Sequence, residues 1–338
     1  MASTTPEGPA HAVPYADSLR ELLLAAIVRC AEHTRVKLPV KWFWPDALPA
    51  VGCLSYDTDS NEDADGRAFL STVKDLGVEG TWCVMYPGGY SRDLYDAIRS
   101  HGDELALHYD ALTSDLRTVD HCGWSQVDFE YQLAWLRHEI GTESVVSQKN
   151  HVTRWEGWTA FYRWLELAGI RVDQTKGPSK IGNLGFAFGS CHPWRPMDDA
   201  LNDNRLMNVL EIGFLTHDMW TSDRRVALRR MLLDAVVAHN GVAHFIFHPQ
   251  RIHQEGMREA FRDVVEYARS LGVQWWTSER IATWESARRA ARVRSAEGSG
   301  LVVEDGPPGL TVVVFGQGSE GDGEPFTAFG ARGLKVTI

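Results

Sequence analysis

Two aspartates follow a short stretch of small and apolar residues near position 50. Residues 50–54 read AVGCL, and Asp57 and Asp59 come three and five residues later. If this segment is a β-strand, the two carboxylates lie on the same side of it, roughly 6.6 Å apart along the strand. One carboxylate could bind a metal ion while the other stays free to accept a proton. The pair therefore indicates a chemical site at the end of a buried strand.

Histidines end two later stretches of the same kind. The sequence ELALHYD (104–110) contains His108 and Asp110, and VAHFIFH (242–248) ends in His248. Alternate residues of a strand face the same side, so His108 and Asp110 share a face. Three further strand-like segments end in or carry the polar residues Lys149, Asn150, His151, Arg154, Asp173 and Glu211. Ionisable groups at so many successive strand ends predict one shared site.

One carboxylate and two imidazoles form a normal hydrolytic zinc site that keeps positions open for water and substrate. Asp59, His108 and His151 meet this requirement. Asp57 could then accept the proton of the metal-bound water, and His248 could protonate the leaving amine from the opposite wall. We therefore expect one divalent ion, with zinc first, although cobalt, manganese, nickel and iron accept the same ligands.

A second histidine, His244, lies four residues before His248. On a helix this H-x-x-x-H spacing would indicate a pair of zinc ligands. In a strand, four residues span about 13 Å, so the two imidazoles cannot bind one ion. We therefore predict a core position for His244 and assign only His248 to the site.

Strand-like and helix-like segments alternate between residues 50 and 293. The strand-like segments are 50–57, 79–85, 104–110, 144–148, 170–174, 206–214, 242–248 and 273–277. The helix-like segments are 64–76, 91–100, 125–140, 156–168, 224–238, 256–271 and 279–293. This alternation predicts an α/β fold with a parallel sheet, a distorted (β/α)7-8 barrel. In such a barrel the loops that follow the strands form the site.

Two smaller segments flank the predicted barrel at 48–294. The first, 1–47, is an N-terminal extension with one amphipathic helix at 15–34 and an irregular link after it. The last, 295–338, contains short β-like runs interrupted by Gly, Pro and Asp, and we expect a small β-rich tail.

The overall composition narrows the class of partner. A net charge of −11 argues against nucleic acid or an anionic membrane as the partner. The five cysteines are dispersed without a C-x-x-C pair, which fits reduced thiols better than a disulfide framework. The apolar run at 22–28 is too short to span a membrane, and the first residues lack the features of a signal peptide. We therefore expect a cytoplasmic protein.

The segment SYDTD (55–59) resembles the opening block of the polysaccharide deacetylase superfamily, the NodB-homology group of carbohydrate esterases. In that superfamily a strand ends in T-F-D-D-G or, in one branch, in F-D-x-D. The resemblance implies that Asp57 is the catalytic base and that Asp59 binds the metal. It also implies a distorted (β/α)7 barrel, in agreement with the alternation of segments.

Two later segments carry the same resemblance. GDELALHYDAL (102–112) matches the block G-H-E-[IL]-x-x-H-x-x-x-H at its glycine, its Glu-Leu pair and the first metal-binding histidine, His108. FHPQ (247–250) resembles the late L-H-D/P block, which implies that His248 is the general acid. The similar region spans about residues 48–285.

The sequence departs from the family blocks at two points. Leu112 stands where the second histidine of H-x-x-x-H belongs. We predict that His151 supplies the missing ligand from the next strand end, with Asp110 as the alternative. The arginine that orients the base in the family has no clear match, and Lys149 or Arg154 could take its place.

These features predict a hydrolase that removes an N-acetyl (amide) group from an intracellular amino sugar or a related metabolite. Two alternatives stay open: hydrolysis of a C–N bond in a ureide or cyclic amide, and a catalytically inactive saccharide-binding protein. Further contacts to the substrate or to the catalytic groups are expected from Asp110, Lys149, Arg154, Asp173 and Glu211. The expected partner is a saccharide or another small molecule.

Overall fold

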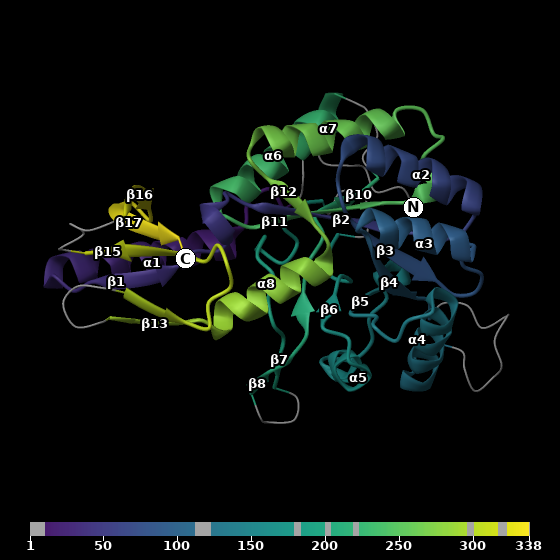
Figure 1. Ribbon diagram of the computed structural model, residues 1–338, viewed down its shortest axis with the longest axis horizontal. Coiled ribbons are helices and arrows are strands. Elements are labelled where there is room, and N and C mark those ends of the chain that lie inside the picture. The colour runs from purple at the N-terminus through teal and green to yellow at the C-terminus, as the bar shows by residue number, and fades with distance from the viewer. Residues whose placement is uncertain are drawn as a thin grey trace.

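A curled sheet of parallel strands forms the centre of the molecule (Figure 1). The computed structural model describes residues 11–111, 123–178, 184–199, 204–218, 223–295, 301–316 and 323–337. Within this part of the chain the strands run in the order β10-β11-β2-β3-β4-β5-β6-β9, with β12 also paired to β2. All of these pairings are parallel, and β9 and β10 do not pair with each other. The predicted α/β barrel is thus confirmed, in a form that stays open between β9 and β10.

The strands of this sheet are short and buried. Their bounds are β2 (Val51–Asp57), β3 (Thr81–Met85), β4 (Glu104–Tyr109), β5 (Ser147–Asn150), β6 (Val172–Asp173), β9 (Leu210–Glu211), β10 (Thr216–His217), β11 (Val242–Phe247) and β12 (Gln274–Trp276). Nearly every residue of β2, β4, β5 and β11 is shielded from solvent. Burial on both faces explains why β2 and β11 are mostly apolar along their length and do not alternate with polar residues.

Helices cover the outside of the sheet. They are α2 (Asp63–Leu76), α3 (Arg92–His101), α4 (Gln126–Ile140), α5 (Ala160–Ala168), α6 (Asp223–Ala238), α7 (Met257–Ser270) and α8 (Ser278–Ala290). Neighbours in the series α6-α7-α2-α3-α4-α5 pack against each other around the sheet (Figure 1). The apolar residues at helical spacing on α3 and α7 account for this packing, since they put one buried stripe on each helix.

A second, antiparallel sheet joins the two ends of the chain. Its order is β1-β15-β17-β16, with bounds β1 (Leu38–Lys41), β15 (Thr311–Phe315), β16 (Glu324–Ala328) and β17 (Ala331–Thr337). Helix α1 (Tyr15–Thr34) packs on it through Val28, beside Trp42 and Phe315. The predicted division into 1–47, 48–294 and 295–338 stays a prediction, but strands from the first and last segments share this sheet, at the left of Figure 1.

Two sequence predictions for strands were wrong in detail. The segment 206–214 is not one strand: β8 (Arg205–Leu206) pairs with β7 (Met197–Asp198), and the chain joins the parallel sheet only at β9. The link after α1 contains β1, whose partner β15 lies far away in the sequence. In the first case β8 pairs with the nearby β7 and does not continue into β9. In the second case the pairing joins distant segments, which local patterns do not record. A hairpin of β13 (Arg292–Ser295) and β14 (Leu301–Glu304) completes the described strands.

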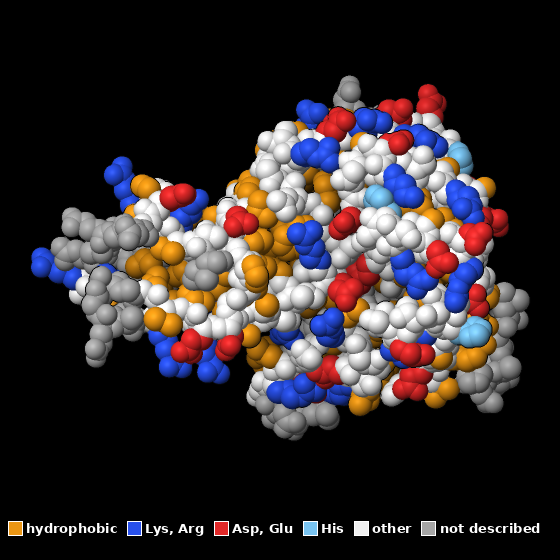
Figure 2. All heavy atoms as spheres, in the orientation of Figure 1, with side chains coloured by type: hydrophobic (Ala, Val, Ile, Leu, Met, Phe, Trp, Pro, Cys, Tyr) orange, Lys and Arg blue, Asp and Glu red, His pale blue; other side chains and the backbone are white. Residues whose placement is uncertain are grey.

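The surface shows no single dominant charge on the face in view. Figure 2 shows acidic and basic side chains intermixed over the barrel. In the described ranges, no helix has the length and apolar character needed to cross a membrane.

Candidate metal centre and catalytic site

A pocket of about 390 Å³ opens at the carboxyl ends of the parallel strands. Its walls include Asp57 and Asp59 from the end of β2, His108 from β4, His151 just after β5, and His248 just after β11. Carboxyl ends of neighbouring parallel strands meet at one edge of a sheet, which is why residues so distant in sequence converge here. The structure therefore brings together the five residues proposed for metal binding and proton transfer.

Asp59, His108 and His151 can converge on one ion. One ligand atom from each lies within 4.8 Å of the others. The Oδ1 atom of Asp59 is buried, accepts no hydrogen bond from the described residues, and lies 3.4 Å from Nε2 of His108. A buried carboxylate oxygen without a donor costs free energy unless a cation or water satisfies it. The set of donors thus fits a divalent metal with nitrogen and oxygen ligands.

Each histidine is held in the tautomer that metal binding requires. Nδ1 of His108 lies 3.1 Å from the backbone oxygen of Lys149, and a carbonyl can only accept, so this nitrogen carries the proton. Nδ1 of His151 lies 3.1 Å from Oδ1 of Asp110. Both rings therefore keep the lone pair of Nε2 for a ligand, as in carboxylate–histidine–zinc arrangements. Asp110, the alternative ligand, contacts His151 from behind.

Asp57 is paired with a buried lysine. Nζ of Lys149 donates to Oδ1 of Asp57 at 2.9 Å, and both side chains are nearly inaccessible to solvent. Burial alone would raise the pKa of Asp57, but the charge of Lys149 and its hydrogen bond to the carboxylate lower this pKa below its usual range. Asp57 is therefore an ionised carboxylate held in one orientation.

Arg154, the other candidate for this role, points elsewhere. Its guanidinium donates to Glu156 at 2.9 Å and to the backbone oxygen of Ala111. Lys149 is thus the cation beside the proposed base.

His248 is held by Asp218, an aspartate that no pattern in the sequence indicates. Nδ1 of His248 hydrogen-bonds to Oδ2 of Asp218, and the backbone N–H of His248 donates to Oδ1 of the same residue at 3.0 Å. Arg251 lies 3.2 Å from Asp218 as well. Burial lowers the pKa of His248, but the contact with Asp218 and the charges of Asp57 and Asp59 raise it above its usual value. Asp218 directly follows β10, which has only two residues. A strand this short leaves no pattern in the sequence, so Asp218 could not be recognised as an acid at a strand end.

Asp173 and Glu211 do not line the pocket. Residues paired across neighbouring strands face the same side, and Asp173 pairs with Gln148 on one side and Glu211 on the other. Lys149 points into the pocket, and Gln148, its neighbour in the strand, faces the other side of the sheet. Asp173 and Glu211 face that side with Gln148, away from the pocket. There Tyr162 of α5 donates to Glu211 at 2.8 Å. The prediction that these two acids belong to the site is not supported by their position.

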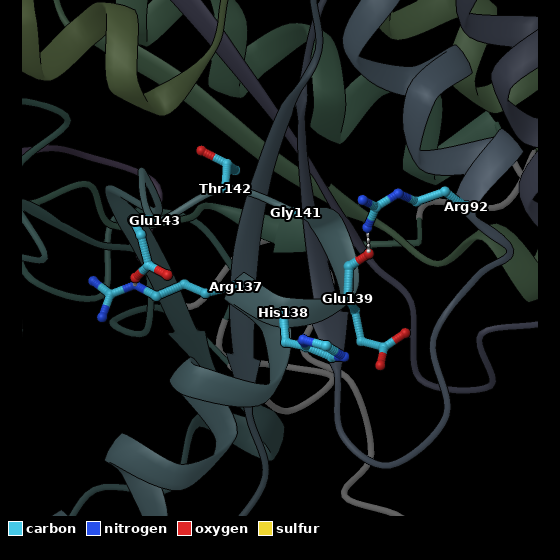
Figure 3. Close-up of a pocket in the computed structure, with 7 residues that line it drawn as sticks. All are labelled: Arg92, Arg137, His138, Glu139, Gly141, Thr142 and Glu143. Atoms are coloured by element: carbon cyan, nitrogen blue, oxygen red, sulfur yellow. Dashed lines mark hydrogen bonds and ion pairs between the residues drawn. The ribbon is translucent and has the colours of Figure 1, made fainter.

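Two other clusters of polar side chains have structural explanations. A depression of about 620 Å³ lies at the carboxyl end of α4 (Figure 3). There Arg92 donates to the backbone oxygen of Glu139, and Arg99 to that of Ile140, both at 2.6 Å. These arginines satisfy the last carbonyls of the helix, which have no partner inside it.

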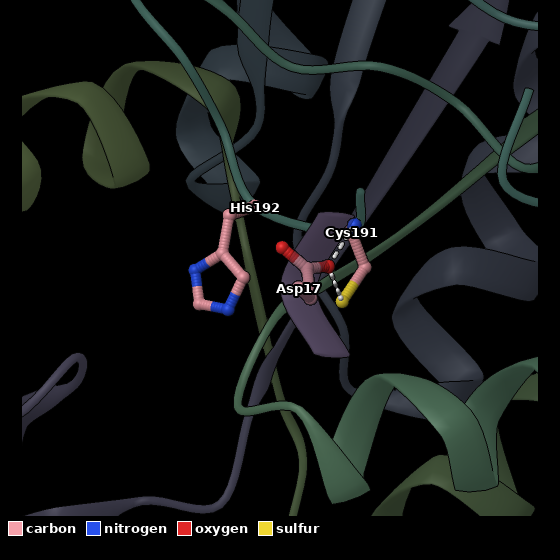
Figure 4. A group of neighbouring side chains, drawn as sticks. All are labelled: Asp17, Cys191 and His192. Carbon is pink, nitrogen blue, oxygen red and sulfur yellow. Dashed lines mark hydrogen bonds between the residues drawn. The ribbon is translucent and has the colours of Figure 1, made fainter. Parts of the chain in front are cut away.

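The second cluster contains Asp17, Cys191 and His192 (Figure 4). Asp17 accepts from the backbone N–H of Cys191 at 2.7 Å, from Ser190 at 2.8 Å and from Arg20 at 3.2 Å. Burial raises the pKa of the Cys191 thiol well above its usual value, which disfavours the thiolate that a metal needs. This carboxylate fastens α1 to the barrel.

Comparison with known proteins identifies the fold. No family model and no curated protein matches the sequence. Among solved structures, a protein from Mycobacterium smegmatis described as a polysaccharide deacetylase aligns with a TM-score of 0.52 and 17% identity, over 73% of this chain and 93% of that one. The chain has the polysaccharide deacetylase fold. The resemblance found in the sequence is confirmed at this level.

Two more solved structures align over a similar share of the chain. A protein from Bordetella bronchiseptica, described as a polysaccharide deacetylase involved in O-antigen biosynthesis, gives a TM-score of 0.42 and 17% identity over 67% of this chain and 86% of that one. The chitin deacetylase of Colletotrichum lindemuthianum gives 0.43 and 14% over 72% and 89%.

Proposed function

We propose that this protein is a metal-dependent hydrolase that removes the N-acetyl group of an amino sugar or a related metabolite. The observation that carries the proposal is the convergence of Asp59, His108 and His151, with both imidazoles turned to offer Nε2. Asp57 and His248 lie on the walls of the same pocket. Ligands and proton-transfer groups thus surround one volume large enough for an acetamido group.

Asp59, His108 and His151 would hold the ion, for which we expect zinc. A divalent ion supplies a Lewis acid that polarises the amide carbonyl and lowers the pKa of a water molecule. Asp110 keeps His151 in the required orientation, because the bond to Nδ1 fixes the ring and its tautomer.

Asp57 is the proposed general base. Its carboxylate is ionised because Lys149 lies beside it, so it can accept the proton of the attacking water. The ion pair also limits rotation of the carboxylate, which places the accepting oxygen before the reaction begins.

His248 is the proposed general acid. Protonated His248 can donate from Nε2 to the leaving amine, since Nδ1 is bonded to Asp218. Asp218 favours the protonated ring, and burial of the ring opposes it. The two proton-transfer groups therefore carry opposite charges before the reaction. The base, Asp57, is a carboxylate anion, and the acid, His248, is an imidazolium cation.

The polysaccharide deacetylase fold supports a saccharide amide over other C–N substrates. An intracellular location for the substrate stays a prediction from the sequence.

The proposal is tested by acetate release from N-acetylglucosamine, from its β-1,4-linked oligomers and from N-acetylated amino acids. A ureide is tested beside them, and its consumption is followed directly because its hydrolysis releases no acetate. We expect the zinc-loaded wild type to release acetate from at least one amino sugar, and Asp57→Asn to keep the ion but lose turnover. Turnover of the ureide alone would favour the second class of C–N substrate. Absence of any turnover by zinc-loaded protein that still binds an oligomer would support the inactive saccharide-binding alternative.

A further inference from the structure

A chain of buried hydrogen bonds runs from the proposed base into the barrel. Nζ of Lys149 lies 2.9 Å from Oδ1 of Asp57 and 2.6 Å from Oγ of Ser55. Oγ of Ser55 lies 2.8 Å from Nε2 of His244, whose Nδ1 lies 2.9 Å from the backbone oxygen of Ile212. Lys149, Ser55 and His244 are each at most 1% exposed.

Each hydrogen bond in this series has a fixed donor and acceptor, and the groups at the two ends determine which is which. The carbonyl of Ile212 can only accept, so Nδ1 of His244 carries a proton. Burial and the nearby charge of Lys149 lower the pKa of His244 to about 3, which keeps the ring neutral and Nε2 without a proton. Ser55 must therefore donate its hydroxyl proton to Nε2. Its oxygen is then left to accept from the ammonium of Lys149.

An ammonium group buried this deeply needs an acceptor for each of its protons. Asp57 and Ser55 provide two, and the ring of Phe214 lies 5.9 Å from Nζ. The family that the sequence resembles uses an arginine beside the base, and a guanidinium holds a carboxylate with several N–H groups in a fixed plane. Lysine has one nitrogen on a flexible stem, so a single contact with Asp57 does not fix its position.

We propose that Ser55 and His244 are positioning residues for the proposed base, acting through Lys149. Ser55 fixes the ammonium from the side opposite Asp57, and His244 fixes the hydroxyl of Ser55 so that its oxygen faces the ammonium. His244 thus serves the site from within the barrel, although it lies too far along β11 from His248 to share an ion with it. The kinetic part of this inference rests on the proposed function, and the part that concerns the hydrogen bonds does not.

The assignment of donors and acceptors among Lys149, Ser55 and His244 is tested without any substrate. Long-range ¹H–¹⁵N correlation spectra of the full-length protein with ¹⁵N-labelled histidine distinguish the two neutral tautomers and the imidazolium, and His244→Phe assigns the signal. We expect His244 to be neutral at pH 7, with the proton on Nδ1, and to keep this state in Ser55→Ala. A proton on Nε2, or an imidazolium, would overturn the inference, whatever reaction the protein catalyses.

The positioning role is tested by kinetics on the substrate that the acetate assay identifies. Ser55→Ala and His244→Phe should lower kcat roughly ten- to a hundredfold, the range for loss of a hydrogen bond to a charged group. KM and zinc content should be unchanged. Ser55→Thr keeps a hydroxyl, and Thr stands at this position in the family block, so it should restore most of kcat.

Cys53→Ala is the matched control for packing, because it shortens a buried side chain two residues earlier on the same strand and removes none of the hydrogen bonds among Lys149, Ser55 and His244. It should retain kcat. Equal kcat for Ser55→Ala and Cys53→Ala would overturn the positioning role. A drop in kcat that Ser55→Thr shares with Ser55→Ala would do the same, since it would trace to packing. If the wild type shows no turnover, the proposed function fails, and the tautomer of His244 alone decides this inference.

Discussion

Among single residues, the buried ion pair of Lys149 and Asp57 should contribute both to the stability of the fold and to turnover. Removing one partner of a buried ion pair leaves the other charge uncompensated, at a cost of about 3–5 kcal/mol. Lys149→Met should therefore lower the free energy of unfolding by about that amount and abolish turnover. Urea denaturation measures the first effect and acetate release the second. Lys74→Met, on the exposed surface of α2, is the control and should change neither. Full stability in Lys149→Met would contradict the account.

The neutral state of His244 predicts a pH dependence of stability. Folded His244 has a pKa of about 3, whereas histidine in an unfolded chain titrates near 6.5. Between pH 3 and pH 6.5 the unfolded chain binds more protons at this histidine than the folded protein does. The free energy of unfolding therefore falls as the pH falls below 6.5, by about 1.4 kcal/mol per pH unit from this residue. Urea denaturation at several pH values gives the free energy of unfolding as a function of pH. Below pH 6.5 this free energy should change less steeply with pH in His244→Phe than in the wild type. Equal slopes would contradict the low pKa.

Asp110 offers a test of the metal centre that leaves the ligands in place. Asp110→Asn should weaken zinc binding about ten- to a hundredfold, because residues that orient a ligating histidine typically contribute this much. Competition with a chromophoric chelator measures the affinity. Asp63→Asn, at the partly exposed start of α2, is a control of the same chemistry and should bind zinc like the wild type. Unchanged affinity in Asp110→Asn would mean that His151 is not a ligand.

At the scale of elements, one carboxylate fastens α1 to the barrel. Asp17→Ala would leave the backbone N–H and the thiol of Cys191 without their acceptor (Figure 4). Ser190 and Arg20 would lose the same acceptor. We expect the free energy of unfolding to fall by about 2–4 kcal/mol, since hydrogen bonds to charged groups contribute about 1.5–3 kcal/mol each and water recovers part of the loss. Glu32→Ala, at an exposed position of α1, should change stability by less than about 0.5 kcal/mol.

The elements with strong local patterns were predicted from the sequence, and the others were not. The amphipathic periodicity of α3 and α7 locates them to within one or two residues. Strand β1 could not be found, because its buried contacts come from β15 and not from its neighbours in sequence. Nor does a local pattern reveal β10, which has only two residues and leads directly to Asp218.

The candidate site was predictable for a different reason. Parallel strands end at one edge, so polar residues at those ends had to meet there, and Asp57, Asp59 and His108 did. Asp173 and Glu211 do not line the pocket, because the face that a residue takes depends on pairing register. Periodicity at the short strands β6 and β9 is too brief to show that register.

At the scale of the whole molecule, the two ends of the chain depend on each other. Strand β1 pairs with β15, and α1 packs against β15 and β17. Ending the chain at residue 294 should leave α1 and β1 without their partner and expose Val28 and Trp42. We expect faster amide hydrogen exchange in residues 15–43, measured by mass spectrometry, and unchanged exchange in β2, β4 and β11. Faster exchange throughout the barrel would instead mean that the tail is part of its core.

The metal content of the purified protein decides whether Asp59, His108 and His151 bind an ion. Wild type, Asp59→Ala, His151→Ala and Glu211→Gln would be loaded with zinc, dialysed and analysed by mass spectrometry. The account predicts about one ion per chain in the wild type and in Glu211→Gln, which lies outside the pocket, and almost none in the other two. No ion in the wild type, or an ion retained in both Asp59→Ala and His151→Ala, would contradict it.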